Sequence, residues 1–205
     1  MIITSVKPIK KSLNQLYIDG EPAVQIDKEV FLLSPYKQGD EISDEELFCL
    51  LEQSNFKRAK ERALYYLERR NFCKKDLINK LYPAFSKETA QEVAEHMEKI
   101  GLINDLEYGK MYARDMVNLK KYGKIRVKSE LYRKGLDKFI IEGILDELWE
   151  EEDNSAQNII SILERRYPNF NEDEKTKRRA IAALQRKGYS YSQIKMAIKD
   201  LEYYE

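Results

Sequence analysis

An internal repeat constrains the fold of this chain more than any other feature of its sequence. Residues 126–148 align with residues 179–201 at an offset of 53 positions and without a gap. Both copies contain the run Arg-Lys-Gly, which ends at Gly135 in the first copy and at Gly188 in the second. A fixed period of this length is typical of small structural units that stack on their neighbours. The sequence therefore predicts tandem copies of one unit rather than a single large core.

Each copy reads as part of a three-helix unit. A more divergent copy occupies residues 74–100, and another helical stretch precedes each copy, at about residues 57–70, 105–121 and 154–166. The chain has 8 glycines and 5 prolines in 205 residues, about half the average usage, which favours extensive helix. The expected fold is mainly α, with three tandem helix-turn-helix-like units in an elongated array. We place these units at residues 43–103, 104–150 and 151–205.

The first 40 residues follow a different pattern and predict a small β-hairpin or three-stranded sheet. Leu13 to Ile18 has strand-forming residues, and Asp19-Gly20 is a two-residue turn signal in which both positions need positive φ. The return strand is expected at Ala23 to Ile26 and a further short strand at Val30 to Leu33. A sheet this small is stable only when it packs on a neighbour. Residues 1–40 are therefore expected to form an N-terminal extension that packs on the helical part of the chain.

Capping signals predict where several helices begin and end. Ser43 with Glu46 forms a capping box at the start of the first helical stretch, and Asn171 with Glu174 predicts a later helix start. Glycines that favour the left-handed conformation are expected to end helices. These predicted stops are Gly101, Gly123, Gly135 and Gly188.

The formal net charge is zero, but the charges are unevenly distributed. Residues 1–57 carry 6 basic and 10 acidic side chains, whereas residues 58–145 carry 20 and 13. Residues 146–153 hold six acids and no base, and residues 154–205 carry 10 basic and 7 acidic side chains. Basic stretches favour contact with nucleic acid or an acidic protein surface, and acidic stretches oppose it. Solvation of exposed helices would give the same pattern.

The repeated helix predicts a basic face in both copies. Arg126 and Arg133 are seven residues apart, nearly two helical turns, and therefore share one face, as do Arg179 and Arg186. Apolar residues between them point to another side, toward the core of each unit. The arginine pairs suit an extended anionic or polar partner. Alternatively, they are solvated cations near helix C-termini, where they complement the helix dipole.

The residues needed for catalysis are scarce, so we expect a protein that is not an enzyme and has no cofactor or metal site. The sequence contains no GxxxxGK[ST] phosphate loop, HExxH or CxxC motif. His96 is the single histidine, and Cys73 lies among basic residues without a histidine beside it. No apolar run approaches the roughly 18–20 residues that span a bilayer. A soluble cytoplasmic protein that does not engage a membrane is therefore expected.

Three short blocks, in order, resemble RecX, the family of proteins that regulate the RecA recombinase. The first block has Ala63, Leu67 and Arg70, and the second has Gly101, Ile103, Asp105 and Tyr108. The third has Lys128, Glu130, Leu131, Lys134 and Gly135. Each block alone is weak evidence, but their order together with the repeat is specific. The similarity covers roughly residues 58–204.

The resemblance implies a monomeric, non-enzymatic modulator in DNA repair and the SOS response. Such proteins bind along the groove of the RecA–DNA filament and restrain ATP hydrolysis, strand exchange and coprotease activity during homologous recombination. The expected partners are therefore the RecA filament and DNA, bound directly or within the filament. A stand-alone DNA-binding protein of helix-turn-helix-like units is the alternative. The candidate contact residues are Arg70, Tyr122, Arg126, Lys128, Arg133, Lys134, Arg179, Arg186, Lys187 and Tyr189.

Overall fold

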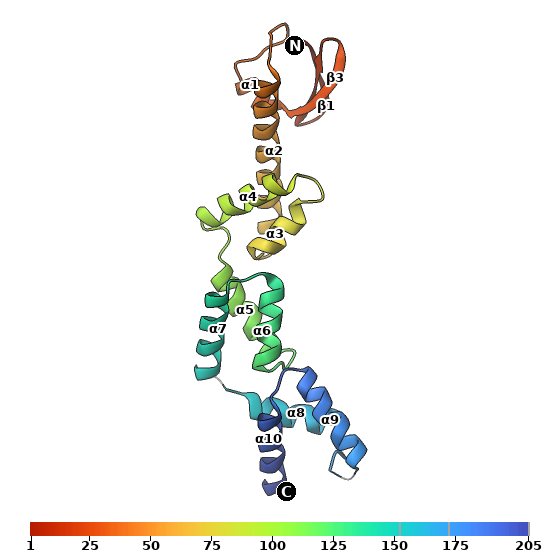
Figure 1. Cartoon of the computed structure of the whole chain (residues 1–205), viewed down its shortest axis with the longest axis vertical. Helices are drawn as coiled ribbons and strands as arrows, with labels where there is room; N and C mark the ends of the chain where they lie inside the picture. The colour runs from red at the N-terminus through yellow and green to blue at the C-terminus, as the bar shows by residue number, and fades with distance from the viewer. Residues whose placement is uncertain (152, 172, 205) are drawn as a thin grey trace. The chain divides into compact units, whose positions relative to one another are not determined.

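The computed structural model describes residues 1–151, 153–171 and 173–204 (Figure 1). The chain divides into two compact units, Met1–Ile103 and Asn104–Glu205. The first contains a small sheet and four helices, and the described residues of the second form helices joined by short connections, without a strand. The predicted mainly α fold with a small N-terminal sheet is therefore confirmed. The finer division into an extension and three repeats stays a prediction.

The sheet is antiparallel, in the order β1 (Ile3–Lys10), β2 (Leu13–Ile18) and β3 (Glu21–Asp27). The predicted turn between β2 and β3 is confirmed, because Asp19 and Gly20 both have positive φ, 51° and 90°. One face of the sheet buries Leu16 and Ile26 in a core that also contains Leu50 of the following long helix. The sheet is thus held by packing on a helix, as its size requires.

The strand predicted at Val30 to Leu33 is wrong, because these residues belong to helix α1 (Lys28–Leu33). The third strand of the sheet is β1 instead. Asp27 directs this outcome, because its carboxylate accepts hydrogen bonds from the backbone N–H groups of Glu29 and Val30, at 3.0 and 3.2 Å. Such a cap satisfies the free N–H groups of a first helical turn and favours helix over strand.

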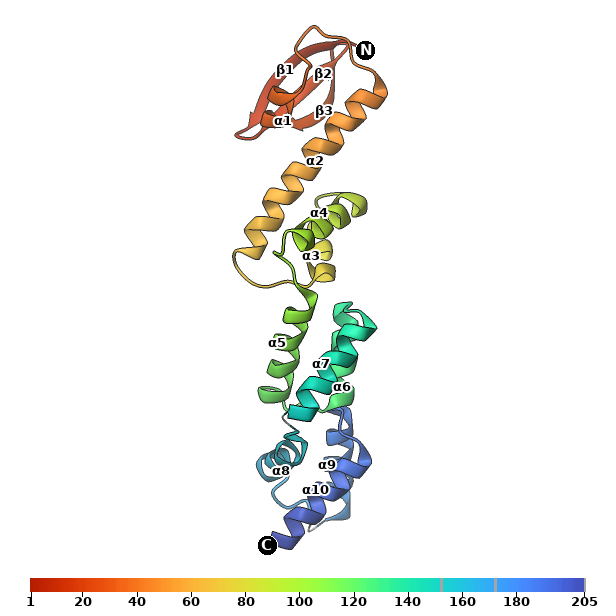
Figure 2. The same ribbon diagram turned by 90° about the vertical axis from the view of Figure 1, so that its left-hand side faces the viewer.

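Helix α2 (Asp44–Leu67) takes part in two separate cores. It begins with the predicted capping box, in which Ser43 and Glu46 bond to each other's backbone N–H groups. Its first half buries Leu50 against the sheet, and its second half buries Ala59 and Ala63 in a helical core. The helices α3 (Lys74–Leu81) and α4 (Lys87–Lys99) complete that second core. Figure 2 shows α2 leading from the sheet to α3 and α4.

The second unit contains two sets of three helices. The first set is α5 (Asp105–Asn118), α6 (Lys124–Lys134) and α7 (Lys138–Glu151). The second set is α8 (Ser155–Arg166), α9 (Glu174–Arg186) and α10 (Tyr191–Tyr204). Helix α7 packs on α5 and α6, and α10 packs on α8 and α9. The predicted repeat is thus visible as the pairs α6–α7 and α9–α10.

Two of the predicted helix boundaries are wrong. Gly123 does not end α5 but occupies the N-cap of α6 with φ −81°. Helix α9 begins after Asp173 rather than Asn171, because the Asp173 side chain accepts bonds from the N–H groups of Lys175 and Thr176. The other predicted stops, Gly101, Gly135 and Gly188, all have positive φ next to a helix end.

Candidate interaction surface

The repeated helices α6 and α9 are amphipathic in the predicted sense. Val127 and Leu131 of α6 are fully buried, as are the equivalent Ala180 and Leu184 of α9. The arginines of both pairs are exposed on the other side. Burial of the short apolar stripe anchors each helix in its own three-helix core and leaves its basic side facing solvent.

The two basic faces differ in one residue, which changes their electrostatics. In α6, the buried carboxylate of Glu130 pairs with Arg126 at 2.7 Å and also with Arg133. The equivalent position in α9, 53 residues later, is Ala183. Arg179 and Arg186 therefore have no carboxylate at the position between them. Glu130 therefore partly offsets the positive charge of the α6 pair, whereas the α9 pair has no such offset at that position.

A close backbone contact joins the start of α6 to the end of α9. The Gly123 N–H donates to the Lys187 carbonyl at 2.9 Å, and the Ile125 N–H donates to the Gly188 carbonyl at 3.3 Å. A Cβ on Gly123 would lie 2.5 Å from the Gly188 oxygen, and a Cβ on Gly188 would lie 2.3 Å from the backbone nitrogen of Arg126. Both positions therefore need glycine for the two segments to approach this closely.

This contact produces a cationic hollow of about 680 Å³. Five cations line the hollow: Lys120, Arg126, Arg166, Arg186 and Lys187. None of the described residues that line it is acidic. The side chains come from the α5–α6 connection, from α6 and from the ends of α8 and α9. The fold thus gathers basic residues that are distant in sequence around one concave surface suited to an anion.

Tyr122 lies at the centre of this charge. Arg126 and Lys187 lie 5.7 and 5.1 Å from its ring centroid, within the range of cation–π attraction. The Lys187 ammonium also donates to the Lys120 carbonyl at 2.6 Å. Burial lowers the pKa of Lys187, and the nearby Arg166 lowers it further. An anionic group in the hollow would oppose both effects and stabilise the charged ammonium.

Comparisons with known proteins identify the family. Two family models match, "RecX, second three-helix domain" over residues 104–145 and "RecX, third three-helix domain" over residues 152–198. A protein of Finegoldia magna called "Regulatory protein RecX" is 33% identical over 178 residues, covering 80% of this chain and 85% of the relative. The chain belongs to the RecX family. A Clostridioides difficile relative of the same name is 29% identical over 204 residues, covering 98% and 95% of the two chains.

The fold of this chain also matches that of a solved structure. A crystal structure titled "Crystal structure of regulatory protein RecX" matches with a TM-score of 0.69 at 20% identity, covering 97% of this chain and 98% of that chain. At this identity the match supports the fold alone. Within the part of the chain that the structure describes, no helix is both long and apolar enough to cross a membrane.

Six of the ten candidate residues of this RecX-family chain do not line the hollow: Arg70, Lys128, Arg133, Lys134, Arg179 and Tyr189. Lys128 lies 4.0 Å from the Glu142 carboxylate on α7. Lys134 lies 5.1 Å from the ring centroid of Tyr112. Arg70 belongs to the first unit, where it lies 4.1 Å from the Phe72 ring centroid. None of these three residues lines the hollow.

Tyr189 is buried and therefore not positioned to contact a partner. It is 2% exposed and packs in the core of α8, α9 and α10. Its hydroxyl donates to the Lys121 carbonyl at 3.0 Å, and burial raises its pKa. The structure thus corrects the expectation that Tyr189 meets a partner, because its ring supports the joint between α6 and α9 instead.

Three cations of the hollow and its rim were not predicted from the sequence: Lys120, Arg165 and Arg166. Arg165 lies with Lys120 and Arg166 in a smaller adjoining depression of about 140 Å³. Their only signal in the sequence is that they stand in short basic runs beside Tyr122 and Tyr167. A basic run alone does not show which side chains face a common hollow, because that depends on how α8 meets the α5–α6 connection.

Proposed function

We propose that this chain regulates the RecA recombinase by binding along the RecA–DNA filament. Membership of the RecX family supports a regulatory role that does not involve catalysis by this chain. The expected effect is negative, with slower ATP hydrolysis, strand exchange and coprotease activity. The cationic hollow carries the proposal, because five cations, with no carboxylate among the described residues that line it, suit the phosphates of DNA within a filament.

We expect the two arginine pairs to have different roles. Arg186 lines the hollow on α9, which has Ala183 at the position of the α6 carboxylate, whereas Arg126 shares its charge with Glu130. We therefore expect the end of α9 to contribute more to filament binding than α6. Lys187 and Tyr122 complete the contact, the first as a phosphate ligand and the second as a ring beside the bound strand.

The decisive experiment is a RecA ATPase assay with single-stranded DNA and increasing amounts of this protein. Arg186→Glu should weaken both filament binding and the effect on ATP hydrolysis by about tenfold, because one charge-assisted contact is lost and repulsion is added. Arg178→Glu is the matched control, since it makes the same charge change at an exposed position of α9 outside the hollow. Equal behaviour of the two variants would contradict the assignment of the hollow.

Binding to bare DNA tests the alternative function. Titration onto duplex and single-stranded DNA without RecA should give weak binding that is independent of base sequence and falls with salt. Tight binding to a particular duplex sequence would instead favour a stand-alone DNA-binding protein.

A further inference from the structure

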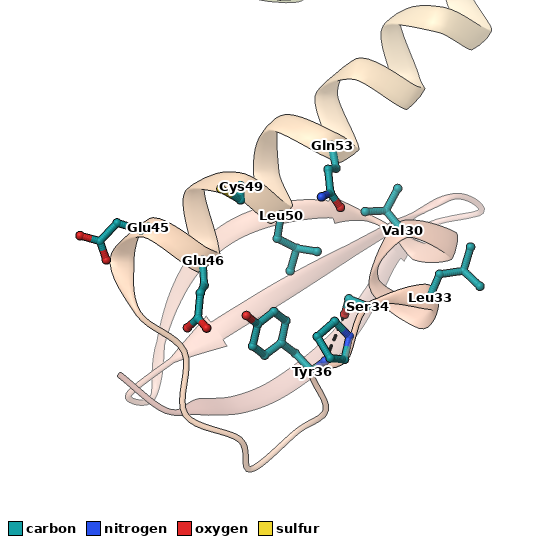
Figure 3. A pocket seen from close by; sticks show the side chains of 10 residues that line it. Val30, Leu33, Ser34, Tyr36, Glu45, Glu46, Cys49, Leu50 and Gln53 are labelled. Atoms are coloured by element: carbon teal, nitrogen blue, oxygen red, sulfur yellow. Dashed lines mark hydrogen bonds between the residues drawn. The ribbon is translucent and has the colours of Figure 1, made fainter.

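An apolar groove of about 480 Å³ lies in the first unit, between α1, the segment after α1 and α2 (Figure 3). Val30, Leu33 and Pro35 line one side, and Leu50 and Cys49 of α2 line the other. Tyr36 lies between the two sides and faces Leu50 (Figure 3). The groove is therefore an apolar depression on a unit that does not contain the cationic hollow.

The rim of this groove is acidic. Glu45 and Glu46 line it, and none of the described residues along the groove is basic. The stretch from residue 35 to residue 53 contains six acids and a single base. Hydrogen bonds from the Ser43 backbone and the Tyr36 hydroxyl lower the pKa of Glu46, which keeps this carboxylate charged. The groove thus combines an apolar floor with fixed negative charge.

The groove also has an apolar side chain available for contact. Leu33 at the end of α1 is 78% exposed, although it borders the groove. A single exposed leucine needs no explanation, but one beside a depression that also contains a proline, a tyrosine and a valine is characteristic of a binding surface. Covering Leu33 would remove apolar area from water and stabilise a complex.

The geometry points to this groove as a docking site for a protein segment that presents an apolar side chain flanked by lysine or arginine. The acidic rim repels phosphate, so the groove disfavours DNA and favours a basic peptide. This inference rests on the proposed function, and the partner segment belongs to the recombinase subunits of the filament. One chain would then bind the protein of the filament through its first unit and the DNA through its second.

Cys49 provides a direct probe of the groove. It is exposed and lines the groove, whereas Cys73, the other cysteine, is fully buried. A maleimide reagent should therefore label Cys49 selectively, and Cys49→Ser provides the unlabelled control. Saturating amounts of RecA–DNA filament should slow the labelling several-fold. DNA alone, or a higher concentration of this protein alone, should leave the labelling rate unchanged.

A pair of neighbouring leucines supplies matched variants. Leu33→Lys removes the apolar contact and adds a charge that repels a basic segment, so filament affinity should fall by about tenfold or more. Leu32→Lys makes the same change at a leucine that is equally exposed, at 78%, and does not line the groove. Because both side chains project into solvent, both variants should fold, which circular dichroism would check.

The outcomes separate this inference from the proposed function. Suppose that the protein binds the filament but Cys49 is still freely labelled, or that the two leucine variants bind with equal affinity. Either result would overturn the docking site and leave the proposed function intact. Protection of Cys49 by DNA alone or by a second copy of the chain would also overturn it, because the occupant would differ. If the unaltered protein does not bind the filament at all, both the proposed function and the docking site fail.

Discussion

At the scale of single residues, the two glycines that join α6 to α9 determine the shape of the cationic hollow. Gly188 combines positive φ, 92°, with a backbone neighbour so close that no side chain fits. Lys187, the residue before it, reaches the Lys120 carbonyl and the Tyr122 ring only because of that close approach. The backbone conformation that Gly188 requires is therefore linked to the position of the neighbouring Lys187 side chain.

Alanine at Gly188 should destabilise the second unit. The added Cβ would meet the Arg126 backbone at 2.3 Å, and alanine disfavours positive φ, so we expect a loss of about 2–4 kcal/mol. Gly143→Ala is the matched control, because Gly143 lies within α7 and a Cβ there would meet nothing within 4 Å. That change should stabilise by about 0.5–1 kcal/mol. Urea denaturation of both variants tests the expectation, and a similar loss in each would contradict it.

The lowered pKa of Lys187 predicts how DNA binding depends on pH. A lysine with a lowered pKa loses its charge at a lower pH than an ordinary lysine does, so binding should begin to weaken in alkaline buffer before other lysines titrate. Lys187→Arg keeps the charge and should move this weakening to higher pH. Affinity for single-stranded DNA, measured across alkaline pH for both proteins, provides the test. Coincident pH profiles would show that Lys187 does not contact the DNA.

At the scale of elements, a polar cluster fixes the sheet to α2. The Asp27 N–H donates to the Ser54 hydroxyl at 2.7 Å, and the Lys57 ammonium lies 2.7 Å from the Asp27 carboxylate. Burial raises the pKa of Asp27, but the hydrogen bond from Lys57 and those from the Val30 and Glu29 backbone lower it by more. The net pKa is lower than usual, so the folded state favours the charged carboxylate.

This cluster predicts a stability difference that depends on pH. A carboxylate whose pKa is lowered by folding stabilises the protein above its unfolded pKa, near 4, and this contribution is lost as pH falls through the folded pKa. Asp27→Asn should cost about 1 kcal/mol at neutral pH, and the difference from the unaltered protein should shrink on acidification below about pH 4. Glu61→Gln is the control, because Glu61 is an exposed partner of the same lysine at 3.8 Å. Denaturation curves at several pH values would measure this difference in stability. A difference that stays constant with pH would contradict the prediction.

At the scale of the whole molecule, the boundary between the two compact units falls between Ile103 and Asn104. Ile103 is buried in the core of α2, α3 and α4, whereas the Asn104 side chain caps α5 by accepting from the Glu107 N–H. A cut between these two residues would therefore leave the core of one unit and the cap of the other intact.

Separate fragments of residues 1–103 and 104–205 should each fold. Circular dichroism should show helix and a cooperative thermal transition for both, because each has its own buried core. The second fragment should keep the salt-dependent binding to DNA, since all residues of the cationic hollow belong to it. A fragment that lacks cooperative unfolding would show that the units depend on each other.

The sequence allowed prediction of the features that depend on local chemistry or on the repeat. The Asp19-Gly20 turn, the Ser43 capping box and the buried stripes of α6 and α9 arise from neighbouring residues, and the structure confirms them. The role of Gly123 was missed, because its requirement comes from Gly188, a residue 65 positions away. The cationic hollow itself was not predicted, although four of the candidate residues line it, because Lys120 and Arg166 reach it through tertiary packing.

Helix α2 limits how the length of this chain can vary. This one continuous helix packs against the sheet at one end and contributes to the core with α3 and α4 at the other. Inserting a single residue near its middle would rotate one end against the other by about 100° and lengthen the helix by about 1.5 Å. Each buried face would then turn away from its own core. Insertions of about seven residues, close to two full turns, would nearly restore the angle, so length changes in this helix should be tolerated only in such steps.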